Sequence, residues 1–346
     1  MLNKLSRSQN NPIFIVGTQR SGTTLLRLIL NAHSQIAIPE EARFLMPLFK
    51  QKYLKHGISG TSMKTLVSYL SQNDQYKLWN YDPREFLLQL SQMESIGLGE
   101  LIDSMFTSYC RSEGKTIWGD KSLFFRTIDI LNTLFPEARF IHIVRDGRDV
   151  FDSWRKMDPS KNNASVIALD WSYKLFKIEQ SFSKIPPGHA FTLRYEDLLE
   201  RPEEVIKEVC AFLNVEYEPA MLDFYKTSHF YIGEHHSHLI FNAISKSNAA
   251  KWRKNLASLE IKSFNLLARH YLKKYRYEIA DVGLSFGDSL KIGMKLLTGI
   301  PKRIGQVVYS SWAGTMALKK GGAEKSLPVG VMPKGKKSAE IREEKT

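Results

Sequence analysis

The sequence of 346 residues contains only two cysteines, Cys110 and Cys210. They stand a hundred positions apart in segments with a helical pattern, and no Cys-x-x-Cys spacing is present. Zinc ribbons, dithiol redox motifs and disulfide frameworks need closely spaced or paired cysteines, so these classes are excluded. We expect two buried free thiols.

Long apolar runs and a signal-peptide core are also missing. No stretch approaches the roughly 18 apolar residues that a membrane-spanning helix requires. The first residues are polar and lead into a short apolar strand, without the core or cleavage site of a signal peptide. We therefore expect a cytoplasmic protein, and its 43% apolar and 25% charged residues are typical of soluble globular chains.

Acidic residues are scarce at the C-terminal end. The chain has 49 Lys and Arg against 36 Asp and Glu, a net charge of +13. Residues 291–346 contribute 12 cations and four glutamates, so they carry +8 and the remaining body only +5. Such an end attracts anionic lipid or nucleic acid, or merely keeps a protein soluble. We expect no nucleic-acid partner, and a peripheral contact of this end with anionic membrane stays open.

Short apolar runs alternate with helical patterns along most of the chain. This alternation predicts an α/β fold around a parallel sheet, with a mostly helical insertion over residues 42–111. Ligands of such sheets bind at the carboxyl ends of the strands. The predicted strands are 12–17, 116–119, 139–144 and 190–194, and the predicted helices are 24–32, 122–134, 147–156, 202–213, 218–227 and 258–274.

The loop Gly17-Thr18-Gln19-Arg20-Ser21-Gly22-Thr23-Thr24 nearly matches a phosphate-binding P-loop, but Thr23 stands where that pattern has lysine. It lies between a strand and a helix, so the amides from Ser21 to Thr24 and the helix dipole favour an anion. The missing lysine normally reaches the terminal phosphates of a nucleoside triphosphate. Arg20 supplies the cation instead, and a sulfuryl group, which is tetrahedral but less charged than a phosphate, would fit. A purely structural glycine turn is the alternative.

A second cluster follows the strand 139–144. Arg145 stands at the carboxyl end of that strand, and Ser153 lies eight residues further along, on the next helix. A guanidinium and a hydroxyl form a natural clamp for a separate phosphate, although a surface ion pair would also explain the arginine. Asp146 and Asp149 are expected to cap the helix.

Together these motifs resemble those of sulfotransferases, which use 3′-phosphoadenosine 5′-phosphosulfate (PAPS). The segment PIFIVGTQRSGTTLLRLILNAH is similar to their 5′-phosphosulfate loop, and RFIHIVRDGRDVFDSW to their 3′-phosphate motif. The similarity is nearest to the group of tyrosylprotein and bacterial sulfotransferases, and it continues through PEEARF, GDKSLF, LRYEDLLERPEEVIKEVCAFL and KWRKNL. It implies a P-loop-like central parallel sheet flanked by helices, with a helical segment at the acceptor site.

The resemblance implies a binding role for several residues. Arg20, Ser21, Gly22, Thr23 and Thr24 would hold the 5′-phosphosulfate, and Arg145 and Ser153 the 3′-phosphate. Tyr195 would lie near the nucleotide. Candidates for closing over it are Ser247, Lys251 and Arg253, whose spacing differs from that of the family.

The resemblance also implies the catalytic residues. Glu41 matches the position of the catalytic base, although the adjacent Glu40 leaves the choice open. Lys121 matches the lysine that stabilises charge around the transferring group, and Arg20 would assist it. A hydroxyl nucleophile needs a carboxylate to take its proton, and the breaking S–O bond needs fixed cations nearby.

The chain also departs from the tyrosylprotein enzymes. It shows neither their membrane anchor nor their extracellular type of cysteine pairing, and Met157 stands where they offer a further arginine. Arg155 or Lys156 are candidates to replace that arginine.

Two other clusters are open to a functional or a structural interpretation. The histidines of Glu234-His235-His236-Ser237-His238 lack a carboxylate cluster nearby, so no metal is expected there. The aromatic residues between positions 79 and 125 would line an acceptor pocket or pack in the core. They are Trp79, Tyr81, Trp118, Phe124 and Phe125.

The sequence therefore predicts a PAPS-dependent sulfotransferase that acts by in-line, metal-independent transfer to a hydroxyl or amine and releases adenosine 3′,5′-bisphosphate. The alternatives are a small-molecule kinase with a degenerate P-loop and a catalytically silent protein that binds nucleotide or anionic lipid. We expect the catalytic domain in 1–285, a basic and partly amphipathic extension in 286–320 and a disordered tail in 321–346. The acceptor (small molecule, glycan, lipid or peptide) and the oligomeric state are not predicted.

Overall fold

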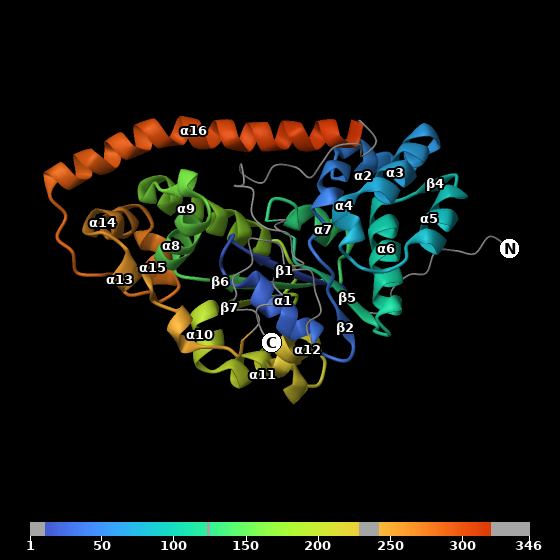
Figure 1. The fold of residues 1–346 in the computed structure, drawn as a ribbon, viewed down its shortest axis with the longest axis horizontal. Helices are drawn as coiled ribbons and strands as arrows, with labels where there is room; N and C mark the ends of the chain where they lie inside the picture. Colours follow the sequence, from blue (N-terminus) through green and yellow to red (C-terminus); the bar gives the residue numbers. More distant parts are fainter. Residues whose placement is uncertain (1–10, 123–124, 228–241, 320–346) are drawn as a thin grey trace, which may run out of the picture.

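The computed structural model describes residues 11–122, 125–227 and 242–319. At its centre is a five-stranded parallel sheet in the order β2-β5-β1-β6-β7 (Figure 1). An α/β fold with a central parallel sheet is therefore confirmed. The strands are Ile13–Gly17 (β1), Ile36–Ala37 (β2), Ile117–Asp120 (β5), Arg139–Val144 (β6) and Ala190–Arg194 (β7).

Both faces of the sheet are buried under helices. In β1, Ile13 and Ile15 belong to one apolar cluster while Phe14 and Val16 belong to another, because successive side chains of a strand point to opposite faces. Burial on both faces explains why the strands appear in the sequence as continuous apolar runs. One face is covered by Thr23–Asn31 (α1), Tyr195–Glu200 (α10), Pro202–Leu213 (α11), Pro219–Asp223 (η3) and Phe224–Thr227 (α12). The other face is covered by Leu98–Ser112 (α6), Ile128–Leu134 (α7) and Ala164–Phe182 (α9).

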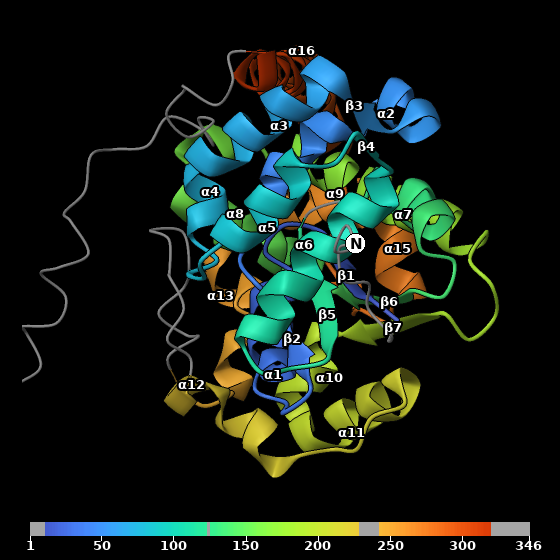
Figure 2. The ribbon, with the colours of Figure 1, turned by 90° about the vertical axis from the view of Figure 1, so that its right-hand side faces the viewer.

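The helical insertion that the sequence predicts lies beside the sheet in Figure 1 and faces the viewer in Figure 2. Within it, a short antiparallel pair, Ile58–Ser59 (β3) and Ser95–Ile96 (β4), joins two segments that lie far apart in the sequence. Its helices before α6 are Arg43–Leu48 (η1, a 3₁₀-helix), Gln51–His56 (α2), Gly60–Gln72 (α3), Asp74–Lys77 (α4) and Arg84–Ser91 (α5).

The aromatic residues of this region form a core instead of an open pocket. Phe106 lies between Trp79 and Trp118, with ring centroids 4.6 and 4.7 Å away. Both tryptophans are buried, and Tyr81 and Phe125 pack against the same cluster. Phe124 lies outside the described residues.

A third cluster joins the C-terminal helices to α9. Its elements include Gly147–Met157 (α8), Trp252–Asn255 (α13), Ser258–Leu267 (α14) and Arg269–Lys274 (α15). The sequence did not predict α9, whose apolar residues lie on several sides because it packs against α8, α14 and the sheet. Beyond these helices, Phe286–Lys319 (α16) runs along the top edge of the molecule (Figures 1 and 2). The predicted tail 321–346 lies outside the described residues.

Cys110 and Cys210 are free and buried, as the sequence predicts. Burial raises the pKa of each thiol to about 11, so neither forms a reactive thiolate near neutral pH. Within the described ranges, no helix is long and apolar enough to cross a membrane.

Candidate functional site

The loop after β1 has a backbone shape suited to an anion. Arg20 and Gly22 both have left-handed φ angles, 68° and 98°, and for an arginine this conformation is strained. A side chain at position 22 would place its Cβ 2.4 Å from the Tyr195 ring, so glycine is required there. Gly22 caps α1, and the N–H groups of the first helical turn, including those of Thr23 and Thr24, have no acceptor within the helix. These groups form a ready anion site.

Ser21 supports this loop from within. Its hydroxyl donates to the Thr18 carbonyl at 2.7 Å, and its amide donates to the same carbonyl at 3.2 Å. The Ser21 amide thus has an acceptor within the loop, and its donation to a ligand stays a prediction.

The two predicted anion clamps meet at the carboxyl ends of β1 and β6. Arg20 Nε donates to Ser153 Oγ at 3.0 Å, and Arg145 Nη1 donates to the Arg20 carbonyl at 3.2 Å. These strands are neighbours in parallel register, so residues that follow them share one edge of the sheet. Arg20 thus joins Arg145 and Ser153 in one hydrogen-bonded group.

Arg145 is held from several sides and still has a donor to offer. Nη2 donates to the Asn248 carbonyl at 2.9 Å, and the guanidinium lies 4.5 Å from the centre of the Tyr195 ring. Its Nε is buried and has no hydrogen-bond partner in the described part of the chain. Burial and the charge of Arg145 lower the pKa of Arg20, and an anion bound between the two guanidinium groups would relieve their repulsion. A buried donor without an acceptor beside two cations fits a phosphate ligand.

The two aspartates after β6 have different roles. Asp146 caps α8 as predicted, with its carboxylate accepting from the Arg148 amide at 2.9 Å. The expected capping by Asp149 is wrong: its Oδ1 accepts from the Trp252 amide at 2.8 Å. This bond ties the segment after residue 245 to α8, beside Arg145.

The three residues predicted to close over the nucleotide lie in different surroundings. Lys251 Nζ donates to Asn248 Oδ1 at 2.9 Å, so it lies beside the residue that Arg145 contacts. Ser247 follows in the 3₁₀-turn Lys246–Asn248 (η5), exposed and hydrogen-bonded to Ser245. Arg253 pairs with Glu278 on the surface. Of the three, Lys251 is best placed to reach the site.

Glu41 and Lys121 form an ion pair at the carboxyl end of β5. Oε1 of Glu41 pairs with Lys121 Nζ, and Oε2 pairs with Arg43 Nε. The Lys121 side chain is only 4% exposed and that of Glu41 is 18% exposed. Burial alone would raise the pKa of Glu41, but the two cations outweigh it and hold the pKa at about 2. Glu41 is therefore ionised throughout the neutral range.

Glu40 is committed to a different part of the structure. Its Oε1 pairs with Arg27 Nη2 at 2.6 Å, and these side chains are only 8% and 2% exposed. Its carbonyl accepts from Trp79 Nε1 at 2.9 Å. A buried glutamate with a buried arginine partner has a structural role. Of the two adjacent glutamates, Glu41 is therefore the one that lies beside Lys121.

The candidates for replacing the arginine at Met157 are engaged elsewhere. Arg155 binds Glu260 at 3.0 Å, and it also donates to the carbonyl of Asn255. Lys156 pairs with Asp152 on its own helix at 2.6 Å. Both therefore brace α8, and neither bonds to a predicted ligand-binding residue in these contacts.

Arg43 is a site residue that the sequence analysis missed. It lies two residues after Glu41 at the start of η1, and the turn there brings its guanidinium back to the carboxylate. The sequence signal for Arg43 was its position in PEEAR, where a cation stands two residues after the candidate base.

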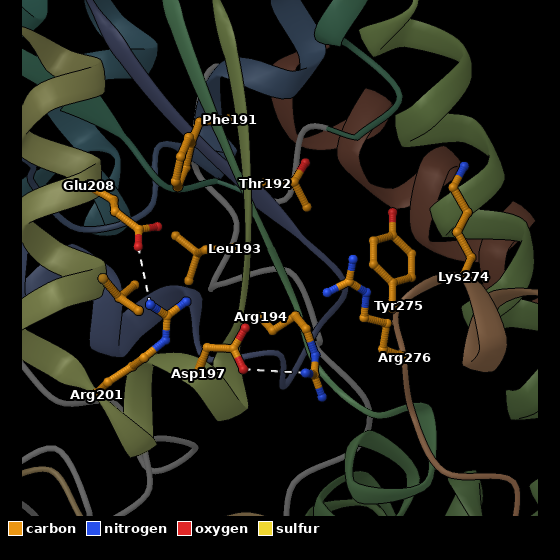
Figure 3. A pocket seen from close by; sticks show the side chains of 11 residues that line it. Phe191, Thr192, Leu193, Arg194, Asp197, Arg201, Glu208, Lys274, Tyr275 and Arg276 are labelled. Carbon is orange, nitrogen blue, oxygen red and sulfur yellow. Dashed lines mark hydrogen bonds and ion pairs between the residues drawn. The ribbon is translucent and has the colours of Figure 1, made fainter.

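A pocket of about 270 Å³ lies apart from this group, beside the edge strand β7 (Figure 3). Its charged side chains are mostly paired: Arg194 with Asp197, and Arg201 with Glu208. None of its lining residues is a predicted site residue. Among the described residues, no three His, Cys, Asp or Glu side chains gather as metal ligands would, and His235, His236 and His238 lie outside those residues.

The central parallel sheet and the hydrogen-bonded group of Arg20, Arg145 and Ser153 at one of its edges define an α/β protein with a candidate anion site. The model of the Sulfotransferase family matches residues 12–219, more than half of the chain. The protein belongs to this family.

Relatives of the chain are similar over much of its length. An uncharacterized protein of Aquifex aeolicus is 25% identical over 79% of this chain, and protein-tyrosine sulfotransferase A of Caenorhabditis elegans is 23% identical over 69%. The chain spans only 35% and 56% of the lengths of these two relatives. The sulfotransferase domain from the curacin biosynthetic pathway has a TM-score of 0.59 at 23% identity, covering 79% of this chain and all of that domain. This likeness shows that the fold is shared.

Proposed function

We propose that this protein transfers the sulfuryl group of PAPS to a hydroxyl or amine acceptor. The observation that carries the proposal is the hydrogen-bonded group of Arg20, Arg145 and Ser153 at the N-terminus of α1. The ion pair of Glu41 and Lys121 follows β5, which is the next strand of the same parallel sheet. Binding groups for two anions and a carboxylate–lysine pair thus gather at the edge where α/β proteins bind ligands.

Each clamp has a distinct part in holding the donor. Arg20 and the amides of Gly22, Thr23 and Thr24 hold the 5′-phosphosulfate. Arg145 and Ser153 hold the 3′-phosphate, and Lys251 reaches the nucleotide from the segment beside Asn248. Tyr195 packs on Gly22 and under Arg145, so it sets the spacing between the two clamps. PAPS supplies the activated sulfuryl group when bound.

Glu41 is the proposed general base. Both of its oxygens are held by cations, so at neutral pH it is ionised and able to accept a proton. With a pKa of about 2 it is nevertheless a weak base. If Lys121 turned toward negative charge on the leaving oxygen of a bound donor, its hold on Glu41 would weaken and the carboxylate would become more basic. Proton acceptance and charge stabilisation would then be coupled through one lysine.

The transfer proposed is in-line, with side-chain cations instead of a metal ion as the stabilising charges. With the donor bound, Arg20 and Lys121 would supply positive charge for the oxygen of the breaking S–O bond, and Glu41 would take the proton of the acceptor as the new S–O bond forms. The released nucleotide is adenosine 3′,5′-bisphosphate, which the Arg145 clamp also recognises.

The acceptor is the open part of the proposal, and relatives differ in this respect. One relative is named a protein-tyrosine sulfotransferase, and one structural neighbour is a sulfotransferase domain from the curacin biosynthetic pathway. The test is to incubate the full chain with sulfur-labelled PAPS and separate pools of tyrosine peptides, glycans, lipids and small metabolites. Label in one pool supports the proposal and names the acceptor class.

Other outcomes of this assay would reject the proposal. Transfer of the γ-phosphoryl group from ATP and Mg²⁺, with none from PAPS, would identify a kinase. Binding of PAPS without hydrolysis or transfer to any pool would identify a catalytically silent protein.

In the same assay Arg145→Ala, which removes the arginine of the 3′-phosphate clamp, should lower transfer. Its matched control is Arg139→Ala, because Arg139 begins the same strand at its opposite end. It should leave transfer unchanged.

A further inference from the structure

The helix α16 is unusual in both its charge and its exposed side chains. Between Asp288 and Glu324 the sequence contains no acidic residue, and the intervening 35 positions carry six lysines and arginines. The helix forms the top edge of the molecule in two perpendicular views (Figures 1 and 2). Helices of the insertion reach about the same height at one end of α16, so a flat surface laid on this edge would meet α16 along most of its length and these helices at its end.

One side of α16 is fixed to the body of the protein. Ile292 is buried, and the backbone at Gly299 is so close to α9 that an added Cβ would lie 2.5 Å from Val166. Arg303 pairs with Asp170 at 3.3 Å, and Gln306 accepts from Lys161 at 2.7 Å. These contacts recur every three to four residues or a multiple of that spacing, so they fix which side of the helix faces outward.

The outward side carries large apolar side chains that no described residue covers. Thirteen large apolar side chains are strongly exposed in the described part of the chain, and seven of them belong to α16. Phe286 is 86% exposed and Leu297 is 77% exposed. The concentration on one helix distinguishes this patch from the scattered exposure of ordinary surfaces. The outer stripe consists of Phe286, Leu290, Met294, Leu297, Ile304 and Val308.

The charges beside this stripe select its partner. Lys291 and Lys302 are exposed. Lys291 follows Leu290 of the stripe, and Lys302 follows Pro301, which lies one turn after Leu297. Each lysine is therefore about 100° around the helix from an outer position. A second copy of α16 would bring the same cations without acidic partners, whereas paired helices generally match opposite charges at their flanks. An anionic lipid surface offers both the apolar medium and the opposite charge.

We infer that α16 binds in the plane of an anionic phospholipid bilayer, with its outer stripe among the acyl chains near the headgroups. Lys291 and Lys302 contact the lipid phosphates from the flank of the stripe. The inner contacts of Ile292 and Arg303 stay in place, so the helix needs no refolding to dock. The inference rests on α16 alone and does not depend on the proposed function.

The experiment is co-sedimentation of the full chain with phosphatidylcholine vesicles, with and without about 30% phosphatidylglycerol. Binding to the anionic vesicles should weaken as NaCl rises from about 0.05 to about 0.5 M, because the lysine contribution is screened. Leu290→Gln/Leu297→Gln/Ile304→Gln should reduce the apparent affinity by at least about tenfold. Leu88→Gln is the matched control, since Leu88 is an equally exposed leucine on α5 and should bind as the wild type does.

Three results would overturn the inference. The first is no binding to anionic vesicles, and the second is unchanged binding by the triple variant. Circular dichroism checks that this variant folds, as expected for exposed positions. The third is a dimer in sedimentation velocity that the triple variant abolishes while vesicle binding is absent, because the stripe would then bind a second copy.

Discussion

The ion pairs of Glu41 predict a measurable dependence of stability on pH. The folded protein holds the pKa of this carboxyl at about 2, whereas the ordinary value is 4.5. A carboxyl with a depressed pKa stabilises the fold fully above its unfolded pKa and loses that contribution as pH falls through the folded value. The relevant window therefore runs from about pH 5 down to about pH 2.

The size of the effect follows from the same two values. Each unit of pKa difference corresponds to about 1.4 kcal/mol, so the interactions of Glu41 contribute on the order of 3 kcal/mol at neutral pH. The side chain is 18% exposed, so solvent screens only part of this contribution. Linkage then predicts a loss of about 2 kcal/mol between about pH 5 and about pH 3.

Urea denaturation of the wild type and of Glu41→Gln, at several values between about pH 7 and pH 3, measures this loss. The glutamine cannot titrate, so the difference in unfolding free energy between the two proteins should shrink by about 2 kcal/mol across that window. Glu203→Gln, at an exposed position of α11, controls for the removal of one carboxylate. Parallel curves for wild type and Glu41→Gln down to pH 3 would refute the ion pairs with Lys121 and Arg43.

The same pKa bears on catalysis. The acid limb of kcat/KM reports the free enzyme, so it should not begin until well below about pH 4 if Glu41 is the base. The limb of kcat reports the complex with substrates and should lie at higher pH, because Lys121 has then turned away. Glu41→Gln should lower kcat by about 10²–10⁴ and leave nucleotide binding intact. An acid limb of kcat/KM near pH 5 in the wild type, retained in Glu41→Gln, would place the base elsewhere.

Three further outcomes are expected. Adenosine 3′,5′-bisphosphate at a hundred times its dissociation constant should stabilise the protein by about 2.7 kcal/mol and ADP by less, and Arg145→Ala should erase most of that preference in thermal-shift assays. In sulfur-label assays Lys121→Ala should lower kcat by about 10²–10³ and raise KM by a smaller factor, and a change mainly in KM would contradict its role. Glu40→Gln should cost about 3–5 kcal/mol in urea denaturation, because it removes the carboxylate that pairs with the buried Arg27, and a neutral result would make that pair unimportant.

Local sequence patterns predict the framework of this fold well. The predicted strands 139–144 and 190–194 match β6 and β7 at both ends, and 12–17 differs from β1 by one residue. Buried parallel strands are continuous apolar runs with polar residues at their ends, so their limits are visible in the sequence. The two-residue strand β2 gives no such signal, and neither does α9, which is buried on several sides.

The parts of the candidate site that lie at strand ends were predictable from the sequence. The ion-pair partners of its side chains were not. Placing Arg20 and Arg145 after two strands of a parallel sheet was enough to bring them to one edge. Which glutamate lies beside Lys121 depends on the turn at the start of η1. That turn directs Glu40 to Arg27 and Glu41 to Lys121, and no local spacing encodes it.

The hydrogen bond from Arg20 to Ser153 has a consequence for selectivity among cellular anions. Two residues that would bind different ends of a donor are bonded to each other in the structure. The Ser153 hydroxyl accepts in this bond and keeps its own proton to donate, so the bond can persist when a ligand binds. It holds the two clamps at one spacing before any ligand arrives. A ligand with two suitably spaced anionic groups contacts both clamps at once, whereas inorganic phosphate reaches only one of them. The bond therefore favours the ligand with two anionic groups, because the spacing is set in advance.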